Sequence, residues 1–315
     1  MDDRSPLQQA LRRFARNRSA LWSAVFLAIG MSLVIGWPVL RIPAVGSVLP
    51  DALIHSADTL SEAQFHPPTR THWFGTDVHG RDLLARVMYG ARVSILVGVV
   101  GAGVSLLIGV SWGAAAGYLG GRWDNMMMRC VDILYSLPSI VFVIVLITTL
   151  EDLFRGWLSR VISPDVGALT RLLFLFAGLG AVSWLTMARI VRGQVLALRN
   201  RPFVDASRAL GAGPVRILAT HILPNLAGVI IVYTTLTIPS IILYESFLSY
   251  LGLGIQPPQA SLGSLLSEGA AQINPVRVYW WVVLAPGGVL AATLMALNFV
   301  GDGLRDAFEP EPDEG

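Results

Sequence analysis

Histidines and acids are the residues that first suggest chemistry. Four of the five histidines lie in one stretch, close to Asp77 and Asp82: His55, His66, His72 and His79. Imidazole and carboxylate groups are ligands for divalent transition metals, so a metal site is conceivable. The histidines lack the close pairing, in sequence, of a typical zinc site. The sequence therefore predicts loop histidines and no metal site.

The basic and nucleophilic residues exclude several reaction classes. All 23 basic residues are arginine. A Walker A phosphate loop needs a lysine that reaches the β- and γ-phosphates, so this chain contains none. Schiff-base chemistry at lysine is excluded for the same reason. Cys130 is the single cysteine and is typical of a small packed side chain. No nucleophile–base pair is identifiable.

Glu245 is the one acid well inside a long apolar stretch. A buried acid in a membrane is costly and is a functional candidate by default. The two interpretations are a structural bond to a neighbouring helix and contact with a transported solute. Pro239 lies in the same stretch, where its missing N–H should kink or bound the helix. The sequence therefore gives Glu245 and Pro239 as candidates for a translocation path.

A polar, arginine-rich segment, residues 201–225, separates two apolar stretches. Pro202 suits the first turn of a short helix, and Asp205 near its start is favoured by the helix dipole. Gly211 can adopt the left-handed conformation that ends a helix, and Pro214 starts the next one. The segment is therefore predicted to form helix, sharp turn and helix. It suits either docking to a partner or an interfacial position on lipid headgroups.

A second polar motif precedes the second apolar stretch: Gly75, Thr76, Asp77, Gly80, Arg81 and Asp82. Thr76 and Asp77 are good turn and cap residues. Asp77, Arg81, Asp82 and Arg86 have helical spacing and are placed to pair. The motif is predicted to form an amphipathic entrance helix and its turn, with contact to substrate or binding protein as the alternative.

The elements that must carry these motifs are membrane helices. Hydrophobic residues make up 54% of the chain and charged residues only 14%, against about 25% charged residues in a soluble domain. Six stretches approach or exceed the roughly 20 residues needed to span a bilayer. They are Leu21–Val39, Val93–Leu119, Val131–Leu150, Leu172–Ile190, Leu226–Tyr250 and Tyr279–Val300.

Arginine distribution predicts the orientation. Arginines gather before the first span, between the second and third, and around residues 193–224. Because short cytosolic loops carry excess arginine, both termini and that loop are predicted to be cytosolic. Gly109, Gly113 and Gly117 in the second span allow close helix packing, either within the chain or against a partner.

The segment reading Asp205-Ala206-Ser207, then Arg208 and Gly211, resembles the cytosolic coupling loop of bacterial ABC-importer permeases. That family's usual pattern is Glu-Ala-Ala, three residues, then Gly. The Gly75–Asp82 motif resembles the C-type permease of the peptide/nickel group, and further matches cover nearly all of the chain after the first helix. The residue pattern of spans four to six is most similar to that of oligopeptide permeases.

The resemblance implies an all-α membrane protein of the type I importer fold, located in the cell inner membrane. Its regions would be residues 1–20, a cytosolic segment; 21–92, a first helix and extracytoplasmic loop; 93–303, the permease core; and 304–315, a cytosolic tail. It implies a coupling loop containing Asp205, Ala206, Ser207, Arg208, Gly211 and Pro214.

The implied partners are a second permease, two ATP-binding subunits, an extracytoplasmic peptide-binding protein and the lipid bilayer, with no nucleic acid. The implied chain is non-catalytic and binds no cofactor, because ATP and Mg²⁺ belong to the ATPase subunits. The alternatives are a permease for nickel or another small solute, an ion-coupled secondary transporter and a membrane-embedded enzyme. The sparse intramembrane acids and the lack of an obvious inverted repeat argue against ion coupling.

Overall fold

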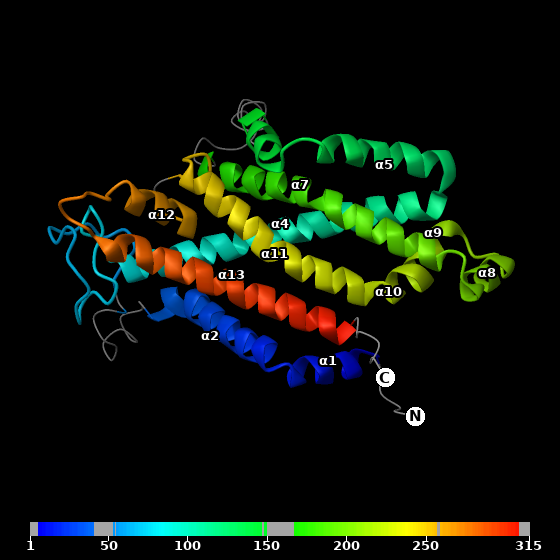
Figure 1. Ribbon diagram of the computed structural model, residues 1–315, viewed down its shortest axis with the longest axis horizontal. Coiled ribbons are helices and arrows are strands. Elements are labelled where there is room, and N and C mark those ends of the chain that lie inside the picture. The colour runs from blue at the N-terminus through cyan, green and yellow to red at the C-terminus, as the bar shows by residue number, and fades with distance from the viewer. Residues whose placement is uncertain are drawn as a thin grey trace. The chain divides into compact units, whose positions relative to one another are not determined.

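The computed structural model describes residues 6–40, 53, 55–146, 148–149, 167–256 and 259–308, and the regular elements in that part are helices (Figure 1). An isolated bridge between Thr76 and Asp82 is the single strand-like pairing there. The elements are α1 (Pro6–Arg16), α2 (Arg18–Leu40), α4 (Leu83–Leu119), α5 (Gly121–Tyr135), α7 (Gly167–Leu198), α8 (Pro202–Ala209), α9 (Pro214–Ile217), the π-helix η3 (Leu218–Ile222), α10 (Leu223–Asn225), α11 (Ala227–Tyr250), α12 (Leu262–Ala270) and α13 (Trp280–Phe308). The all-α prediction is confirmed.

Four helices in the described residues are long and apolar enough to cross a membrane, namely α2, α4, α11 and α13. A fifth span is reached if the bent pair formed by α5 and Ser139–Leu146 is counted as one. The predicted fourth span, Leu172–Ile190, falls within α7. The predicted count of six stays a prediction.

The predicted third span, Val131–Leu150, is wrong as a single straight helix. α5 ends at Tyr135, and Ser139–Leu146 follows at an angle of 93°. Pro138 lacks an N–H and disfavours helical backbone at the residue before it, which accounts for the break. The Ser136 hydroxyl donates to the Ile133 carbonyl at 2.7 Å and so helps to satisfy the end of α5.

The second span begins at Leu83 rather than at the predicted Val93. Asp82 caps the helix, because its Oδ2 accepts the backbone N–H of Ala85 at 2.8 Å. Leu84 and Ala85 are buried in a cluster with Trp37 and Ala57. A cap and a buried apolar turn thus extend the helix into the polar motif.

The chain divides into two compact units. Unit 1 comprises Met1–Leu21, Gly98–Ile241 and Val300–Gly315, and unit 2 comprises Trp22–Val97 and Ile242–Phe299. The three arginine-rich regions belong to unit 1. The polar motif before α4 and the segment between α11 and α13 belong to unit 2. The regions that were predicted to be cytosolic thus fall in one unit. The orientation of the chain in the membrane stays a prediction.

Glycines of α4 lie directly against α7 within unit 1. A Cβ at Gly109 would meet Met187, a Cβ at Gly113 would meet the Ala188 carbonyl oxygen, and a Cβ at Gly117 would meet Val195. The absence of side chains therefore allows the two backbones to approach closely. The interpretation of this glycine row as packing within the chain is confirmed.

The end of the last helix also differs from the expected boundary. The predicted tail began at residue 304, but α13 continues to Phe308. Ala307 is buried, and the Phe308 ring lies against Gly228. The helix therefore continues because its last turn packs within unit 1. Residues 309–315, the rest of the predicted tail, lie outside the described residues.

Candidate coupling site and charged clusters

The segment between α7 and α11 forms the predicted helix, turn and helix. Pro202 is the first residue of α8, and Asp205, Ala206, Ser207 and Arg208 follow on that helix. The Gly211 N–H donates to the Arg208 carbonyl at 2.9 Å, and the Ala212 N–H donates to the Ser207 carbonyl at 3.0 Å. These two bonds form a Schellman motif, which requires the left-handed Gly211 backbone, φ 84°. Pro214 begins α9.

Two buried side chains hold this elbow, residues 201–217, to the rest of unit 1. Val204 of α8 and Ile217 of α9 are fully buried in one cluster with Met187, Val191 and Val195 of α7. Because each short helix contributes an anchor, the turn between them is positioned by the core of unit 1.

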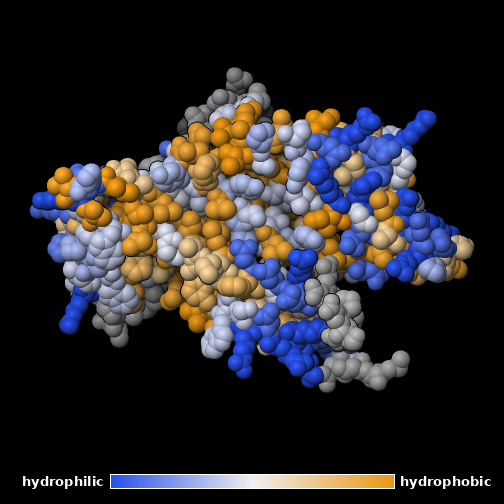
Figure 2. All heavy atoms as spheres, in the orientation of Figure 1, coloured by the Kyte–Doolittle hydropathy of each residue, from blue (hydrophilic) through white to orange (hydrophobic). Residues whose placement is uncertain are grey.

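The opposite side of the elbow exposes apolar side chains. The exposed fractions are 90% for Leu210, 79% for Val215 and 40% for Phe203. Figure 2 shows hydrophilic residues gathered at the end of the molecule where α8 lies, with some hydrophobic residues among them. Asp205 and Arg208 form an exposed pair at 3.2 Å, which contributes at most about 1 kcal/mol. The elbow therefore presents apolar side chains on a rigid support.

An arginine–aspartate network joins α5 to α7 in unit 1. Arg192 binds both carboxylate oxygens of Asp124, at 2.5 and 2.7 Å, and Arg189 binds Asp132 at 2.7 Å. Both arginines and Asp132 line a polar cavity of about 560 Å³. The bidentate geometry fixes α5 along α7.

The polar motif before α4 forms a compact loop, and the helix that follows it begins at Leu83. Gly75, Thr76, Asp77, Gly80 and Arg81 precede the helix, and Asp82 caps it. The Thr76 hydroxyl donates to the Ala63 carbonyl and accepts the His66 N–H. Asp77 Oδ1 accepts the N–H groups of His79 and Arg81. These local side-chain bonds offer the backbone an alternative to a helix.

The predicted charge pairs do form within that loop, around a buried carboxylate. Asp77 Oδ2 accepts from Arg81 Nε at 2.7 Å and from Arg86 Nη1 at 2.8 Å. Burial alone would raise the pKa of Asp77. The hydrogen bonds from Arg81 and the charges of Arg81 and Arg86 outweigh burial and hold the pKa below its usual value. Asp77 is therefore ionised at neutral pH.

Sequence reasoning missed the fourth member of this cluster, Glu268 of α12. Its two carboxylate oxygens accept from Arg86 at 2.6 and 3.1 Å, and Arg81 lies 3.3 Å from Oε2. Two arginines thus meet two carboxylates, so the cluster is neutral. Glu268 is more than 180 residues from its partners, and no local spacing could have indicated it.

Glu245 is fully buried in unit 2 among serine hydroxyls. Ser94 donates to its Oε2 at 3.0 Å and Ser249 to its Oε1 at 2.7 Å. Ser94 Oγ also accepts the Leu262 N–H at the start of α12. This geometry matches the structural interpretation, a bond to a neighbouring helix. Pro239 is buried within α11 in unit 1. A role for either residue in a translocation path stays a prediction.

Comparison with known proteins identifies the family. Residues 109–313 match the family described as "Binding-protein-dependent transport system inner membrane component". The chain is 43% identical to the oligopeptide transport system permease protein OppC of Escherichia coli K12 over 99% of this chain and 93% of that protein. It is 40% identical to OppC of Haemophilus influenzae, over 99% and 90% of the two chains. It is 39% identical to the dipeptide transport system permease protein DppC of Bacillus subtilis, over 96% and 85%.

A solved structure shares the fold. It is an inward-facing MetNI methionine ABC transporter, with a TM-score of 0.53 at 20% identity over 71% of this chain and 97% of that chain. The likeness supports the predicted type I importer fold. The family match covers the elbow, the arginine network and Glu245. The chain belongs to the family of binding-protein-dependent transport system inner membrane components and is an ABC-importer permease of the C type.

Proposed function

We propose that the chain carries peptides, in particular oligopeptides, across the cytoplasmic membrane as one of two permease subunits of an ATP-driven importer. The names of the similar permeases, OppC and DppC, support a peptide cargo. Two cytosolic ATPase subunits bind ATP and Mg²⁺, and an extracytoplasmic binding protein delivers the peptide. In this proposal the chain has no catalytic residue and binds no cofactor, and its N-terminus is cytosolic.

The observation that carries the proposal is the elbow formed by α8, Gly211 and α9. It is fixed to α7 through Val204 and Ile217 and exposes Leu210 and Val215. Apolar side chains on a rigid support are the anchors expected at a protein interface. We infer that they enter a groove on an ATPase subunit, so that closure of the ATPase pair moves α8 and α9 together with α7.

Coupling then follows from a two-state equilibrium. ATP shifts the transporter toward one conformation only if it binds that conformation more tightly. The elbow transmits the shift because its anchors, Val204 and Ile217, pack against α7, and α7 in turn packs against the glycines of α4. Hydrolysis and release of the nucleotide then reset the permease.

The test is uptake by the full complex in proteoliposomes, with binding protein and labelled oligopeptide outside and ATP inside. ATP-dependent uptake that persists when ion gradients are collapsed supports the proposal. Uptake driven by a proton or sodium gradient without ATP would contradict it. ATP-dependent uptake of nickel without uptake of peptide would reject the proposed peptide cargo but not the ATP-driven importer.

A further inference from the structure

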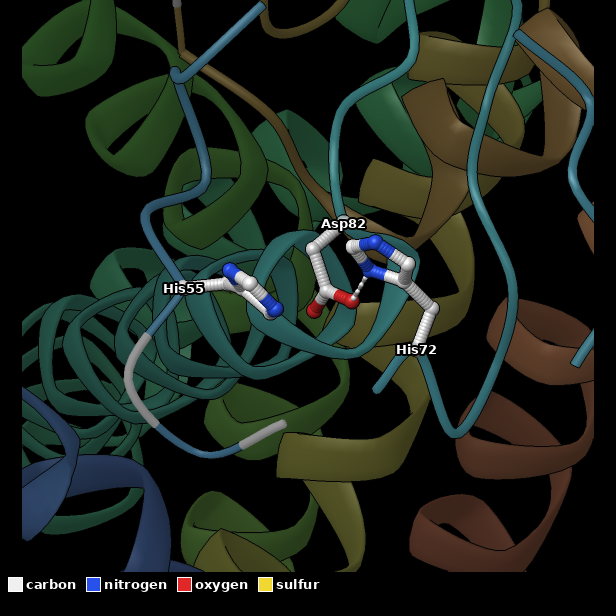
Figure 3. Close-up of side chains that lie close together, drawn as sticks. All are labelled: His55, His72 and Asp82. Atoms are coloured by element: carbon white, nitrogen blue, oxygen red, sulfur yellow. Dashed lines mark hydrogen bonds and ion pairs between the residues drawn. The ribbon is translucent and has the colours of Figure 1, made fainter. Parts of the chain in front are cut away.

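The fold gathers two of the four loop histidines around the capping aspartate of α4. His55, His72 and Asp82 each offer a ligand atom, and the three atoms lie within 4.8 Å of one another. Figure 3 shows the Asp82 carboxylate close to both imidazole rings and joined to His72 by a hydrogen bond. Histidine spacing alone predicted no metal site, because these ligands are far apart in the sequence, with Asp82 27 positions after His55. His66 and His79 are exposed and do not belong to this group.

The chemistry of the group fits a borderline divalent metal such as Zn²⁺. Two imidazoles and one carboxylate are ligands that such a metal prefers. Metal–ligand bonds of about 2.0–2.2 Å place tetrahedral ligand atoms about 3.3 Å apart. His72 Nδ1 and Asp82 Oδ1 are 2.9 Å apart already, and the remaining atom pairs need only small side-chain shifts.

Two features show that the group is held in place. Asp82 Oδ2 accepts the Ala85 N–H, so one oxygen is oriented by the helix and the other faces His72. A hydrogen-bonded carboxylate of this kind is typical of an oriented metal ligand. The second feature is an apolar cluster that contains Ala57, Phe74 and Leu84. Each of these residues lies two positions after one of the three ligands, so the cluster holds all three segments together.

His55 provides the observation that hydrogen bonding does not explain. Its Nε2 is buried and has no hydrogen-bond partner. Its ring stacks on His72, with centroids 4.6 Å apart and an angle of 22° between the planes. Buried polar atoms are nearly always satisfied, and an exception requires an explanation such as a bound ion. A metal shared with His72 and Asp82 would satisfy it.

We propose that His55, His72 and Asp82 form a Zn²⁺ site in unit 2. The metal replaces the hydrogen bond between His72 and Asp82, with the neutral His72 ring carrying its proton on Nε2, and accepts the lone pair of His55. Three protein ligands leave at least one coordination position open to water or an exogenous ligand. Bound metal would link His55 to Asp82, the residue that caps the first turn of α4. The proposal is independent of the transported cargo.

The test is isothermal titration of Zn²⁺ into the full-length chain, purified in detergent, stripped with chelator and freed of any histidine tag. Mg²⁺ is the control metal. We expect one equivalent of Zn²⁺ per chain and no Mg²⁺ binding. His55→Ala and His72→Ala should weaken binding by more than the roughly 10–100-fold that loss of an outer-shell partner costs.

Two further variants keep the test independent of folding. Asp82→Asn preserves a good helix cap but removes the anionic ligand, so it should fold and bind Zn²⁺ more weakly. His66→Ala removes an exposed histidine of the same loop and should bind as the unaltered chain does. Among these proteins, Zn²⁺ should raise the thermal unfolding midpoint only for the unaltered chain and for His66→Ala. An unaltered chain that fails to bind Zn²⁺, or a His55→Ala variant with unchanged affinity and stoichiometry, would overturn the site.

Discussion

At the scale of single residues, Gly211 controls the elbow. Its left-handed backbone closes the Schellman motif, and a Cβ there would meet nothing within 4 Å. Substitution therefore acts through backbone strain, of roughly 1–2 kcal/mol for an ordinary residue and more for a β-branched one.

We expect Gly211→Val to uncouple ATP hydrolysis from peptide uptake in proteoliposomes at normal assembly of the complex. Gly211→Asn is the matched control, because asparagine tolerates the left-handed conformation, and it should retain most transport. Full transport by the valine variant would contradict the role of the turn.

Asp77 gives a prediction with a pH dependence. Removal of one partner from a buried ion pair costs about 3–5 kcal/mol. We expect Asp77→Asn to lower the free energy of unfolding by about 3 kcal/mol at pH 7. Because the folded-state pKa is lowered, the contribution is present above the ordinary carboxyl pKa and is lost as the pH falls through the folded value.

Thermal unfolding of both proteins in detergent between pH 7 and pH 3 checks this. The two unfolding midpoints should converge toward the acid end, where Asp77 becomes protonated. A gap that is constant across the range, or that widens on acidification, would reject the proposed ionisation.

Local spacing predicted some partners of these residues and missed others. Asp77, Arg81 and Arg86 are close in sequence, so their pairing was predictable. Glu268 and the hydroxyl of Ser94 reach Arg86 and Glu245 from distant segments, and tertiary packing alone brings them there. The grouping of His55 with His72 was missed for the same reason.

At the scale of elements, the helix pair α4 and α7 yields a prediction about packing. Gly113 and Gly103 are both glycines of α4. A Cβ at Gly113 would meet the backbone of α7, with Arg192 N at 3.0 Å, whereas a Cβ at Gly103 would meet nothing. Alanine is favoured over glycine in a helix by about 1 kcal/mol when space allows.

We therefore expect Gly103→Ala to leave the unfolding midpoint unchanged or raised, and Gly113→Ala to lower it. Overpacking of this kind costs about 1–3 kcal/mol. The measurement is thermal unfolding of the purified chain in detergent. Equal midpoints for the two variants would mean that α4 and α7 do not approach as closely as described.

The elements themselves were predictable where local signals were strong. Pro202 marks the start of α8, Gly211 the turn after it and Pro214 the start of α9, and the structure has these helices at the predicted positions. The third span was wrong because apolar content alone does not register the helix break at Pro138. The predicted start of α4 was wrong because apolar content alone places the start of the span at Val93. Apolar content does not detect the buried first turn that Asp82 caps.

At the scale of the whole molecule, composition and arginine distribution predicted a membrane bundle with one polar, arginine-rich side. The structure groups those arginine-rich segments in unit 1, together with the end of α13. Asn17 donates to Asp306 at 3.3 Å, so the two ends of the described chain meet within that unit. Division into two units was not predictable, because apolar periodicity within lipid-facing helices carries no information about which helices cluster.

The central claim is that the exposed apolar side of the elbow binds the ATPase subunits. The most direct measurement is co-purification of those subunits with the tagged permease in mild detergent. The variant is Leu210→Asp combined with Val215→Asp, and the control is Val276→Asp, an apolar residue of unit 2 that is 85% exposed.

The unaltered chain and Val276→Asp should each recover a second permease and two ATPase subunits. The double variant should keep the second permease, because the elbow's buried anchors are unchanged, and should lose the ATPase subunits. Full recovery of the ATPase subunits by the double variant would contradict the account and favour an interfacial role for the elbow at the lipid surface.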